Sequence, residues 1–209
     1  MKGLITKDLF MLVKYFKLYF LMDIIFIVLA FTSPENVIFL MIPALLTGVI
    51  PITLLAYDER SRWTEYSGVL PYSRTQIVSA KYLVGLLLQS AMCIILYILM
   101  LLRGAYYDMF DPAGSAVTVL ILFVAALVFP SVCLPFCFAL GTEKGRIVYM
   151  ITIAMIVSIL AAMSNSGVPE KDLIMTKIPP IIWVIIIAIY ALSWLLSAAI
   201  YNKKETAKV

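Results

Sequence analysis

The sequence predicts an all-α polytopic membrane protein, with six transmembrane helices that follow an amphipathic interfacial helix. The chain of 209 residues is 64% hydrophobic and only 13% charged, whereas soluble domains carry about 25% charged residues. Six apolar segments approach the roughly 20 residues that a helix needs to cross a bilayer. Lys and Arg gather in alternate connections between these segments. We therefore expect residues 1–209 to form a single transmembrane domain with both termini in the cytoplasm.

The predicted spans are almost free of charge. Five contain no Asp, Glu, Lys or Arg, and the first contains only Asp23. Prolines at positions 43, 51, 130 and 135 lie inside spans, where neighbouring helices must satisfy the carbonyl groups that proline leaves free. We therefore expect these helices to face protein. The six spans cover residues 18–32, 37–56, 82–102, 115–140, 147–163 and 179–201.

Local signals mark several helix boundaries. Ser33 can cap a helix that starts with Pro34, because a serine at the N-cap and a proline at the first helical position are both favoured. Residues 73–76 read Ser-Arg-Thr-Gln, the pattern of a capping box. A proline pair at 179–180 can open the last helix. These signals agree with the predicted spans.

The distribution of basic residues predicts the orientation. With the N-terminus inside, only Arg103, Lys171 and Lys177 of the 16 Lys and Arg residues fall outside. Inner connections of bacterial membrane proteins carry such an excess of positive charge. The longest charged connection, residues 57–75, is therefore predicted to lie in the cytoplasm.

Residues 1–17 are predicted to form an amphipathic helix at the inner membrane interface. Lys7, Lys14 and Lys17 recur at helical spacing, while Leu4, Phe10 and other apolar residues occupy the positions between them. Such a helix lies in the plane of the interface. The alternative is a positively charged segment that only fixes the topology.

Several classes of chemistry lack their residues. The chain contains no histidine and no glycine-rich phosphate loop ending in Lys-Ser or Lys-Thr, so it offers neither a histidine-based active site nor that route to ATP. Cys93, Cys133 and Cys137 lie in apolar stretches and are interpreted as small buried hydrophobic residues. We expect no catalytic residue, metal site, cofactor or nucleic-acid partner for this chain.

Asp23 and Gln89 are the polar residues within spans that suggest a role. Polar groups in a membrane interior usually line a pathway or pair between helices. Asp23 lines an inner vestibule or pairs with a neighbouring helix, or it is a hydrated interfacial acid. For Gln89 we favour an interhelical hydrogen bond over contact with a substrate.

The connection YDERSRWTEYSGVLPYSR carries the densest charge in the chain. Asp58 can cap a short helix that runs to about Tyr66 and ends at Gly68. Glu59, Trp63 and Tyr66 then share one face of that helix. Trp, Tyr and Arg are enriched in protein–protein hot spots, so this face is predicted to bind a partner. The alternative is an aromatic belt at the lipid headgroups.

The opening MKGLITKDL, the stretch PITLLAYDERSRW and the stretch VLPYSRTQIVSAKYLVG resemble the membrane subunits of ABC-2 type transporters. The resemblance is greatest to the small permeases of the phenol-soluble modulin exporter type. It implies two permease copies, identical or paired siblings, in a bacterial plasma membrane. It also implies separate ATPase subunits that bind ATP and Mg²⁺. The implied cargo is an amphipathic cytolytic or antimicrobial peptide.

The resemblance also assigns roles to residues. The first inner loop of these permeases inserts into the ATPase, which implies coupling roles for Asp58, Glu59, Arg62, Trp63 and Tyr66. The segment GTEKGR at 141–146 corresponds to a second, smaller contact with the ATPase, made by Glu143, Lys144 and Arg146. Residues 164–178 are too few for the external domain of larger relatives. Two alternatives remain: export of lipids or hydrophobic drugs, and a membrane anchor or sensor that docks a partner through residues 57–74 without transport.

Overall fold

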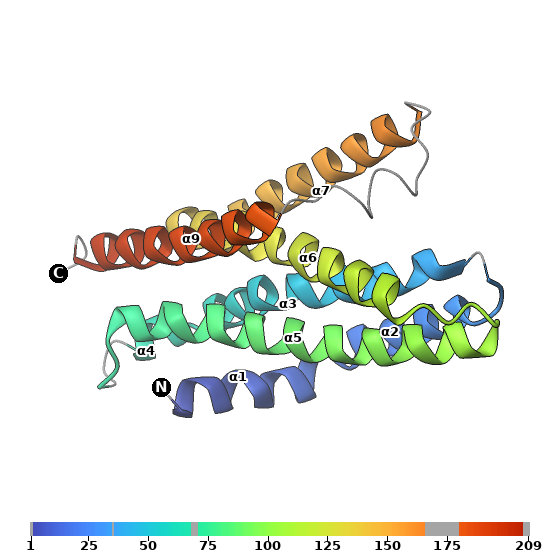
Figure 1. The fold of residues 1–209 in the computed structure, drawn as a ribbon. Helices are drawn as coiled ribbons and strands as arrows, with labels where there is room; N and C mark the ends of the chain where they lie inside the picture. The colour runs from blue at the N-terminus through green and yellow to red at the C-terminus, as the bar shows by residue number, and fades with distance from the viewer. Residues whose placement is uncertain (1, 35, 68–70, 166–179, 207–209) are drawn as a thin grey trace.

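The computed structural model describes residues 2–34, 36–67, 71–165 and 180–206, and helices are its regular elements, joined by short turns (Figure 1). No β-strand occurs among these residues. The all-α prediction is therefore confirmed. The elements are α1 (Lys2–Tyr15), α2 (Lys17–Ala30), the 3₁₀ helix η1 (Asn36–Leu40), α3 (Met41–Arg60), α4 (Trp63–Ser67), α5 (Arg74–Tyr106), α6 (Pro112–Leu140), α7 (Thr142–Asn165) and α9 (Pro180–Thr206).

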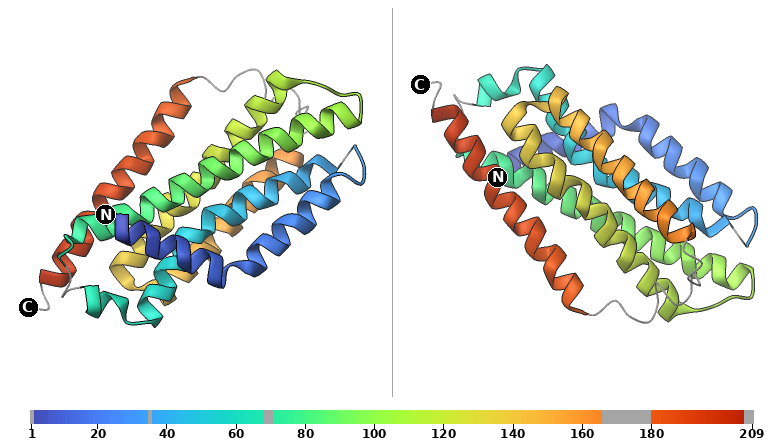
Figure 2. Two further views of the ribbon diagram at one scale, coloured as in Figure 1. Left: turned by 90° about the horizontal axis from the view of Figure 1, so that it is seen from below. Right: turned by 90° about the horizontal axis from the view of Figure 1, so that it is seen from above.

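Helix α6 is the centre of the bundle. It packs against α3 and α5 and also against α7 and α9 (Figure 2). Its neighbour α5 has 33 residues, about 50 Å of helix at 1.5 Å per residue. The start of α1, the short helix α4, the start of α7 and the end of α9 gather at one end of the bundle, on the left in Figure 1. We call this the α4 end.

A helix lies at each of the six predicted spans, in the predicted order. By length and apolar composition, three of the described helices are able to cross a membrane: α3, α5 and α6. Helix α2 covers the first predicted span but has only 14 residues, about 21 Å, which is shorter than a bilayer core. Membrane crossing by all six segments therefore stays a prediction.

Close backbone contacts hold α3 against its neighbours. A Cβ atom added to Gly48 would lie 2.6 Å from the carbonyl oxygen of Ala126 in α6, and one added to Gly85 of α5 would lie 2.6 Å from Pro51 Cγ of α3. Pro43, Pro51 and Pro130 are buried, as predicted for kinked helices that face protein. Glycine at these crossings lets the helices approach closely, as is common between membrane helices.

The apolar core runs along the bundle as three clusters of buried side chains. One at the α4 end includes Leu4, Val78 and Leu134, a middle one includes Phe16 and Leu54, and one toward the other end includes Leu40. The three cysteines are buried without forming disulfides, which confirms their interpretation as small hydrophobic residues.

Helix α1 has two distinct faces. Leu4, Asp8 and Leu12 are buried against the bundle. Phe10 and Val13 are 72% and 69% exposed on the other side. α1 lies obliquely across the bundle in Figure 2. An outward apolar face beside exposed lysines fits the interfacial helix that the sequence predicts.

The boundary signals were partly right. Ser73 and Gln76 form the predicted capping box at the start of α5, and α9 begins at Pro180. The N-cap predicted at Ser33 was wrong, because a 3₁₀ turn precedes α3, which starts only at Met41. The C-terminal signal predicted at Gly68 lies outside the described residues.

At the end of the bundle opposite the α4 end, two residues near the end of α5 bind the end of α2 and the segment that follows it. Arg103 Nε donates to the carbonyl oxygen of Ala30 at 2.9 Å, and its Nη2 donates to that of Ser33 at 3.2 Å. Tyr107 Oη donates to the carbonyl oxygen of Phe31 at 2.7 Å. A guanidinium at these positions satisfies carbonyl groups that the end of α2 leaves without helical partners.

Candidate functional site: the polar face of the α4 end

The side chains of Asp58, Glu59 and Arg60, in the last turn of α3, lie in three different environments. Asp58 is 2% exposed and turns toward α1 and α5, Glu59 reaches α7, and Arg60 is exposed. The predicted short helix from Asp58 to Tyr66 does not form. Instead α3 continues through Arg60, so Asp58 lies within a helix and caps nothing.

The break between α3 and α4 lies at Ser61 and Arg62. Arg62 has a φ of +53°, in the left-handed region, and its amide donates to the carbonyl oxygen of Glu59 at 3.1 Å. Glu59 therefore belongs to α3, whereas Trp63 and Tyr66 belong to α4, and the predicted common face was wrong. The carboxylates of Asp58 and Glu59 find their partners only when α3 extends this far, which explains the difference.

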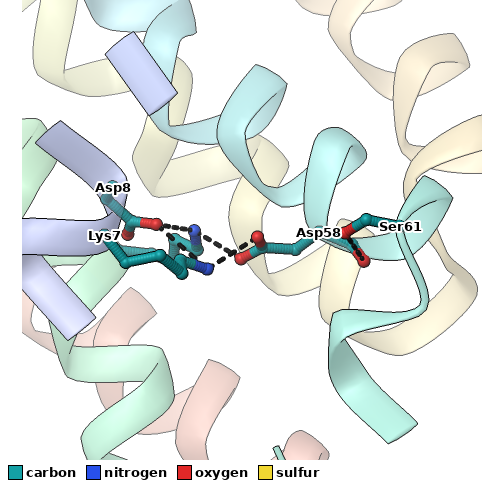
Figure 3. A network of polar contacts seen from close by, with 5 residues as sticks. Lys7, Asp8, Asp58 and Ser61 are labelled. Carbon is teal, nitrogen blue, oxygen red and sulfur yellow. Dashed lines mark hydrogen bonds and ion pairs between the residues drawn. The ribbon is translucent and has the colours of Figure 1, made fainter. Parts of the chain in front are cut away.

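Asp58 belongs to a buried cluster of four charges, which we call the ion cluster: Lys7, Asp8, Asp58 and Lys81. Figure 3 labels Lys7, Asp8 and Asp58 of this cluster. Lys7 Nζ lies 3.2 Å from Asp8 Oδ1 and 2.7 Å from Asp58 Oδ1. Lys81 Nζ lies 2.8 Å from Asp8 Oδ1 and 2.6 Å from Asp58 Oδ2. Each lysine therefore pairs with each carboxylate, and the four charges sum to zero.

Burial makes this pairing obligatory. Asp8 is 1% and Lys81 2% exposed, while the side chain of Lys7 is 22% exposed. A buried ion costs several kcal/mol of hydration unless an opposite charge and good hydrogen bonds replace the water. Three helices supply these charges, so the ion cluster ties α1, α3 and α5 together at one point.

Trp63 extends the ion cluster to α4. Lys7 Nζ lies 4.4 Å from the centroid of its ring, within the range of a cation–π contact. The ring also lies 5.4 Å from that of Tyr66. The indole nitrogen of Trp63 is buried and has no hydrogen-bond partner among the described residues.

Glu59 joins the two segments that were predicted to contact a partner. Its Oε2 accepts a hydrogen bond from the amide of Thr142, the first residue of α7, at 2.8 Å, and another from Thr142 Oγ1. A carboxylate at the start of a helix satisfies a free amide and interacts favourably with the helix dipole. Gly141 has a φ of +88°, which suits glycine at the tight turn between α6 and α7.

The other predicted coupling residues differ in exposure. Arg62 and Tyr66, which follow Glu59 in the chain, are exposed, and so are Glu143 and Lys144, which follow Thr142. Trp63 is partly buried. The side chain of Arg146 lies outside the described residues. The α4 end therefore presents exposed residues of both segments next to each other.

Sequence reasoning missed the roles of Lys7, Asp8, Lys81 and Thr142, although the spacing held a signal for two of them. Asp8 lies midway between Leu4 and Leu12 on the packed face of α1. Lys81 lies midway between Ile77 and Gly85 on the packed face of α5. A charge at the position of an apolar residue in a helical stripe indicates a buried partner.

Asp23 and Gln89 lie inside the bundle, but no hydrogen bond joins them. Asp23 is 7% exposed, and its Oδ1 has no hydrogen-bond partner among the described residues. Gln89 was interpreted as an interhelical hydrogen-bonder, yet its Nε2 donates within α5, to Cys93 Sγ at 3.7 Å. Its Oε1 is also buried and without a partner among the described residues.

A chain of hydroxyl groups holds α9 against α5 and α6. Ser193 Oγ donates to the carbonyl oxygen of Ser131 at 2.6 Å, so it accepts its 2.7 Å bond from Tyr82 Oη. Tyr82 Oη in turn accepts from Ser197 Oγ at 2.7 Å. Beside this chain lies a mostly apolar open groove of about 320 Å³, lined by Ser79, Tyr82, Leu83, Leu86, Tyr190, Ala191 and Trp194.

Comparison with known proteins decides the family. The model of a family described as ABC-2 family transporter protein matches residues 3–202, nearly the whole chain. The chain belongs to the ABC-2 transporter family. Searches of curated proteins and of solved structures found no match. The resemblance to ABC-2 membrane subunits is therefore confirmed, and the family membership agrees with the apolar helices α3, α5 and α6.

Membership gives the α4 end a context. The protein is a membrane component of an ABC-2 transporter, a class in which transport, not catalysis, is the task of this component. Its helices account for a membrane location. At the α4 end, exposed charged residues follow both partners of the Glu59–Thr142 contact, and Asp58 of the buried ion cluster directly precedes Glu59.

Proposed function

We propose that this ABC-2 protein is the permease subunit of an exporter and that a separate ATPase subunit binds its α4 end from the cytoplasm. One observation carries the proposal: Glu59 binds the first residue of α7. This contact places the segment around residues 60–66 next to the segment around residues 142–146. A partner that binds the α4 end contacts both at once.

The docking surface, as we propose it, consists of the exposed side chains Arg60, Arg62, Tyr66, Glu143 and Lys144. Asp58 and Glu59 fix the position of this surface through their contacts with Lys7 and Thr142. Trp63 adds a contact between α4 and Lys7. Tyr and Arg supply most of the binding energy in many interfaces. A pair of positive charges around an aromatic ring suits an acidic groove on the ATPase.

The affinity for an ABC ATPase subunit tests the docking surface. Tyr66 and Tyr106 are both exposed tyrosines, 58% and 72%, at opposite ends of the bundle. Tyr66→Ala should weaken ATPase binding at least about tenfold, since loss of a hot-spot aromatic costs about 2 kcal/mol. Tyr106→Ala is the matched control and should leave binding unchanged. Affinity is measured by titrating the purified ATPase onto the protein in nanodiscs.

Equal effects of the two tyrosine substitutions would overturn the docking surface. A protein that binds no ATPase in either form would overturn the permease proposal as a whole. An ATPase that binds without any transport would favour the alternative of a membrane anchor or sensor.

The cargo we propose is an amphipathic peptide, exported from the cytoplasm or from the inner leaflet. The groove between α5 and α9 supports this choice, because Tyr82, Tyr190 and Trp194 give it an apolar lining with polar atoms at its edge. Such a lining suits apolar side chains on one face of a helical peptide. Lipids and hydrophobic drugs share part of this chemistry and are the alternative cargo.

A photoreactive residue separates these cargoes. Placed at Leu86 in the groove, it should crosslink a synthetic cationic amphipathic helix when the ATPase is present. Placed at Leu120, which is 51% exposed on α6, it should not. Crosslinking of phospholipid but not peptide at Leu86 would favour lipid export.

A further inference from the structure

The ion cluster has an unusual connectivity, because its four charges come from three helices and close a ring. Lys7 and Asp8 lie on α1, Asp58 on α3 and Lys81 on α5. Asp58 binds Lys7 through Oδ1 and Lys81 through Oδ2. Both lysines also share Asp8 Oδ1. No two of the three helices can shift relative to each other without lengthening at least one of these pairs.

The closed ion cluster resists a gradual displacement of the three helices more than the surrounding apolar contacts do. Apolar side chains that slide past each other keep most of their buried area. A buried ion that loses its partner instead incurs the full penalty of desolvation. The ion cluster therefore has two stable states: a closed state in which all its pairs are formed, and an open state in which its charges are hydrated. Over small movements, α1, the end of α3 and the start of α5 behave as one rigid body.

This rigid body touches the proposed docking surface. Asp58 precedes the exposed Arg60 by two residues, about 3 Å along the helix. Lys7 lies against the ring of Trp63 in α4. A partner that displaces α4 or the end of α3 therefore acts on the ion cluster within one helical turn.

We propose that the ion cluster is the joint that transmits movement of the α3–α4 end to α1, with Lys7 and Asp58 as positioning residues. This inference rests on the proposed function, because the displacement comes from the ATPase. Lys7 and Asp58 form the pair that connects α3 to α1. Asp8 and Lys81 form the pair that connects α1 to α5.

Two matched double substitutions separate transmission from simple stabilisation. Lys7→Met with Asp58→Asn removes α3 from the ion cluster and leaves the 2.8 Å pair between Asp8 and Lys81. Asp8→Asn with Lys81→Met cuts α5 out and leaves the 2.7 Å pair between Lys7 and Asp58. Each variant removes one lysine and one aspartate, and neither leaves a charge without a partner.

A fluorescent probe on α1 reports the transmitted movement without any cargo. Phe10 is 72% exposed on the outer face of α1, and the three native cysteines are buried. A bimane label on Phe10→Cys therefore reads the surroundings of α1 alone. Emission is recorded for the protein with its ATPase in nanodiscs, before and after addition of ATP and Mg²⁺, with a hydrolysis-deficient ATPase to hold the bound state.

We expect ATP to change the emission in the otherwise native protein and in the Asp8→Asn, Lys81→Met variant. At an ATPase concentration that saturates each variant, the Lys7→Met, Asp58→Asn variant should lose at least about four-fifths of the change in emission, a fivefold reduction at the lower end of ordinary allosteric coupling. Lys7→Arg with Asp58→Glu keeps the charges and should restore the response. Thermal midpoints of the variants are measured alongside, because a purely stabilising ion cluster predicts responses that follow stability.

Three results would overturn the inference: an unchanged response in the Lys7→Met, Asp58→Asn variant, equal losses in both double variants, or no response to ATP in the native protein although the ATPase binds. Each of these leaves the proposed function standing. Failure of the native protein to bind any ATPase would overturn both.

Discussion

At the scale of single residues, the four buried charges of the ion cluster depend on one another. Lys81 is 2% exposed and neutralises both Asp8 and Asp58. Without it, two buried carboxylates share the single ammonium group of Lys7. The energy of the cluster is therefore a property of the set, and substitution of one member differs in kind from substitution of a pair.

Lys81→Met should lower the free energy of unfolding by about 3–5 kcal/mol, the usual effect of removing one partner of a buried ion pair. Adding Asp8→Asn should recover most of this loss, because the remaining pair is again neutral. Denaturant titration in detergent micelles measures both variants. Additive losses in the double variant would show that the two side chains act independently.

Glu59 is the other residue whose role depends on its partner. Glu59→Ala should destabilise the protein by about 1 kcal/mol, because the first amide of α7 loses its acceptor. Lys144→Ala, at an exposed residue in the same turn of α7, is the control and should change stability little. Thermal unfolding of the two variants side by side is the measurement, and equal midpoints would contradict the capping role.

At the scale of elements, local signals predicted the start of α5 but not the end of α3. The capping box at Ser73 and Gln76 needs only two residues three positions apart, so the sequence alone could predict it. The end of α3 depends on Lys7, Lys81 and Thr142, which are remote in sequence. Local capping rules therefore placed Asp58 at the start of a helix, whereas tertiary contacts place it near the end of one.

The crossing of α3 and α6 depends on a missing side chain. Gly48→Ala places a Cβ atom 2.6 Å from the backbone oxygen of Ala126, so the two helices must move apart. We expect a loss of about 1–3 kcal/mol, as for other overpacked contacts. Gly114→Ala, in the first turn of α6, is the control and should be neutral or slightly stabilising, because alanine favours helix. Equal unfolding midpoints for both variants would contradict the close packing.

At the scale of the whole molecule, the α4 end and the opposite end differ in chemistry. The α4 end carries exposed Arg60, Arg62 and Lys144, whereas Arg103 at the other end binds backbone carbonyl groups. This asymmetry agrees with the positive-inside rule if the α4 end faces the cytoplasm.

Labelling in intact bacteria tests this orientation. A membrane-impermeant maleimide should label Met109→Cys, at an exposed residue of the far end (67%). Tyr66→Cys and Glu143→Cys should react only after the cells are permeabilised. The native protein is the control, because its three cysteines are buried. Labelling of Tyr66→Cys in intact cells would reverse the orientation.

The sequence by itself determined the class of the protein. Apolar composition requires lipid as solvent, apolar length yields helices, and family motifs spread over nearly the whole chain carry the resemblance that the family comparison confirmed. These properties depend on composition and on short-range patterns, which a single sequence contains.

Only the tertiary structure decided how the charged residues are used. Lys7, Asp58 and Lys81 are 51 and 23 positions apart along the chain, and nothing local shows that they meet. Their partners are set by how three helices pack, and burial then makes the pairing obligatory. The same packing turned Glu59 from a surface residue of a predicted loop into the link between α3 and α7.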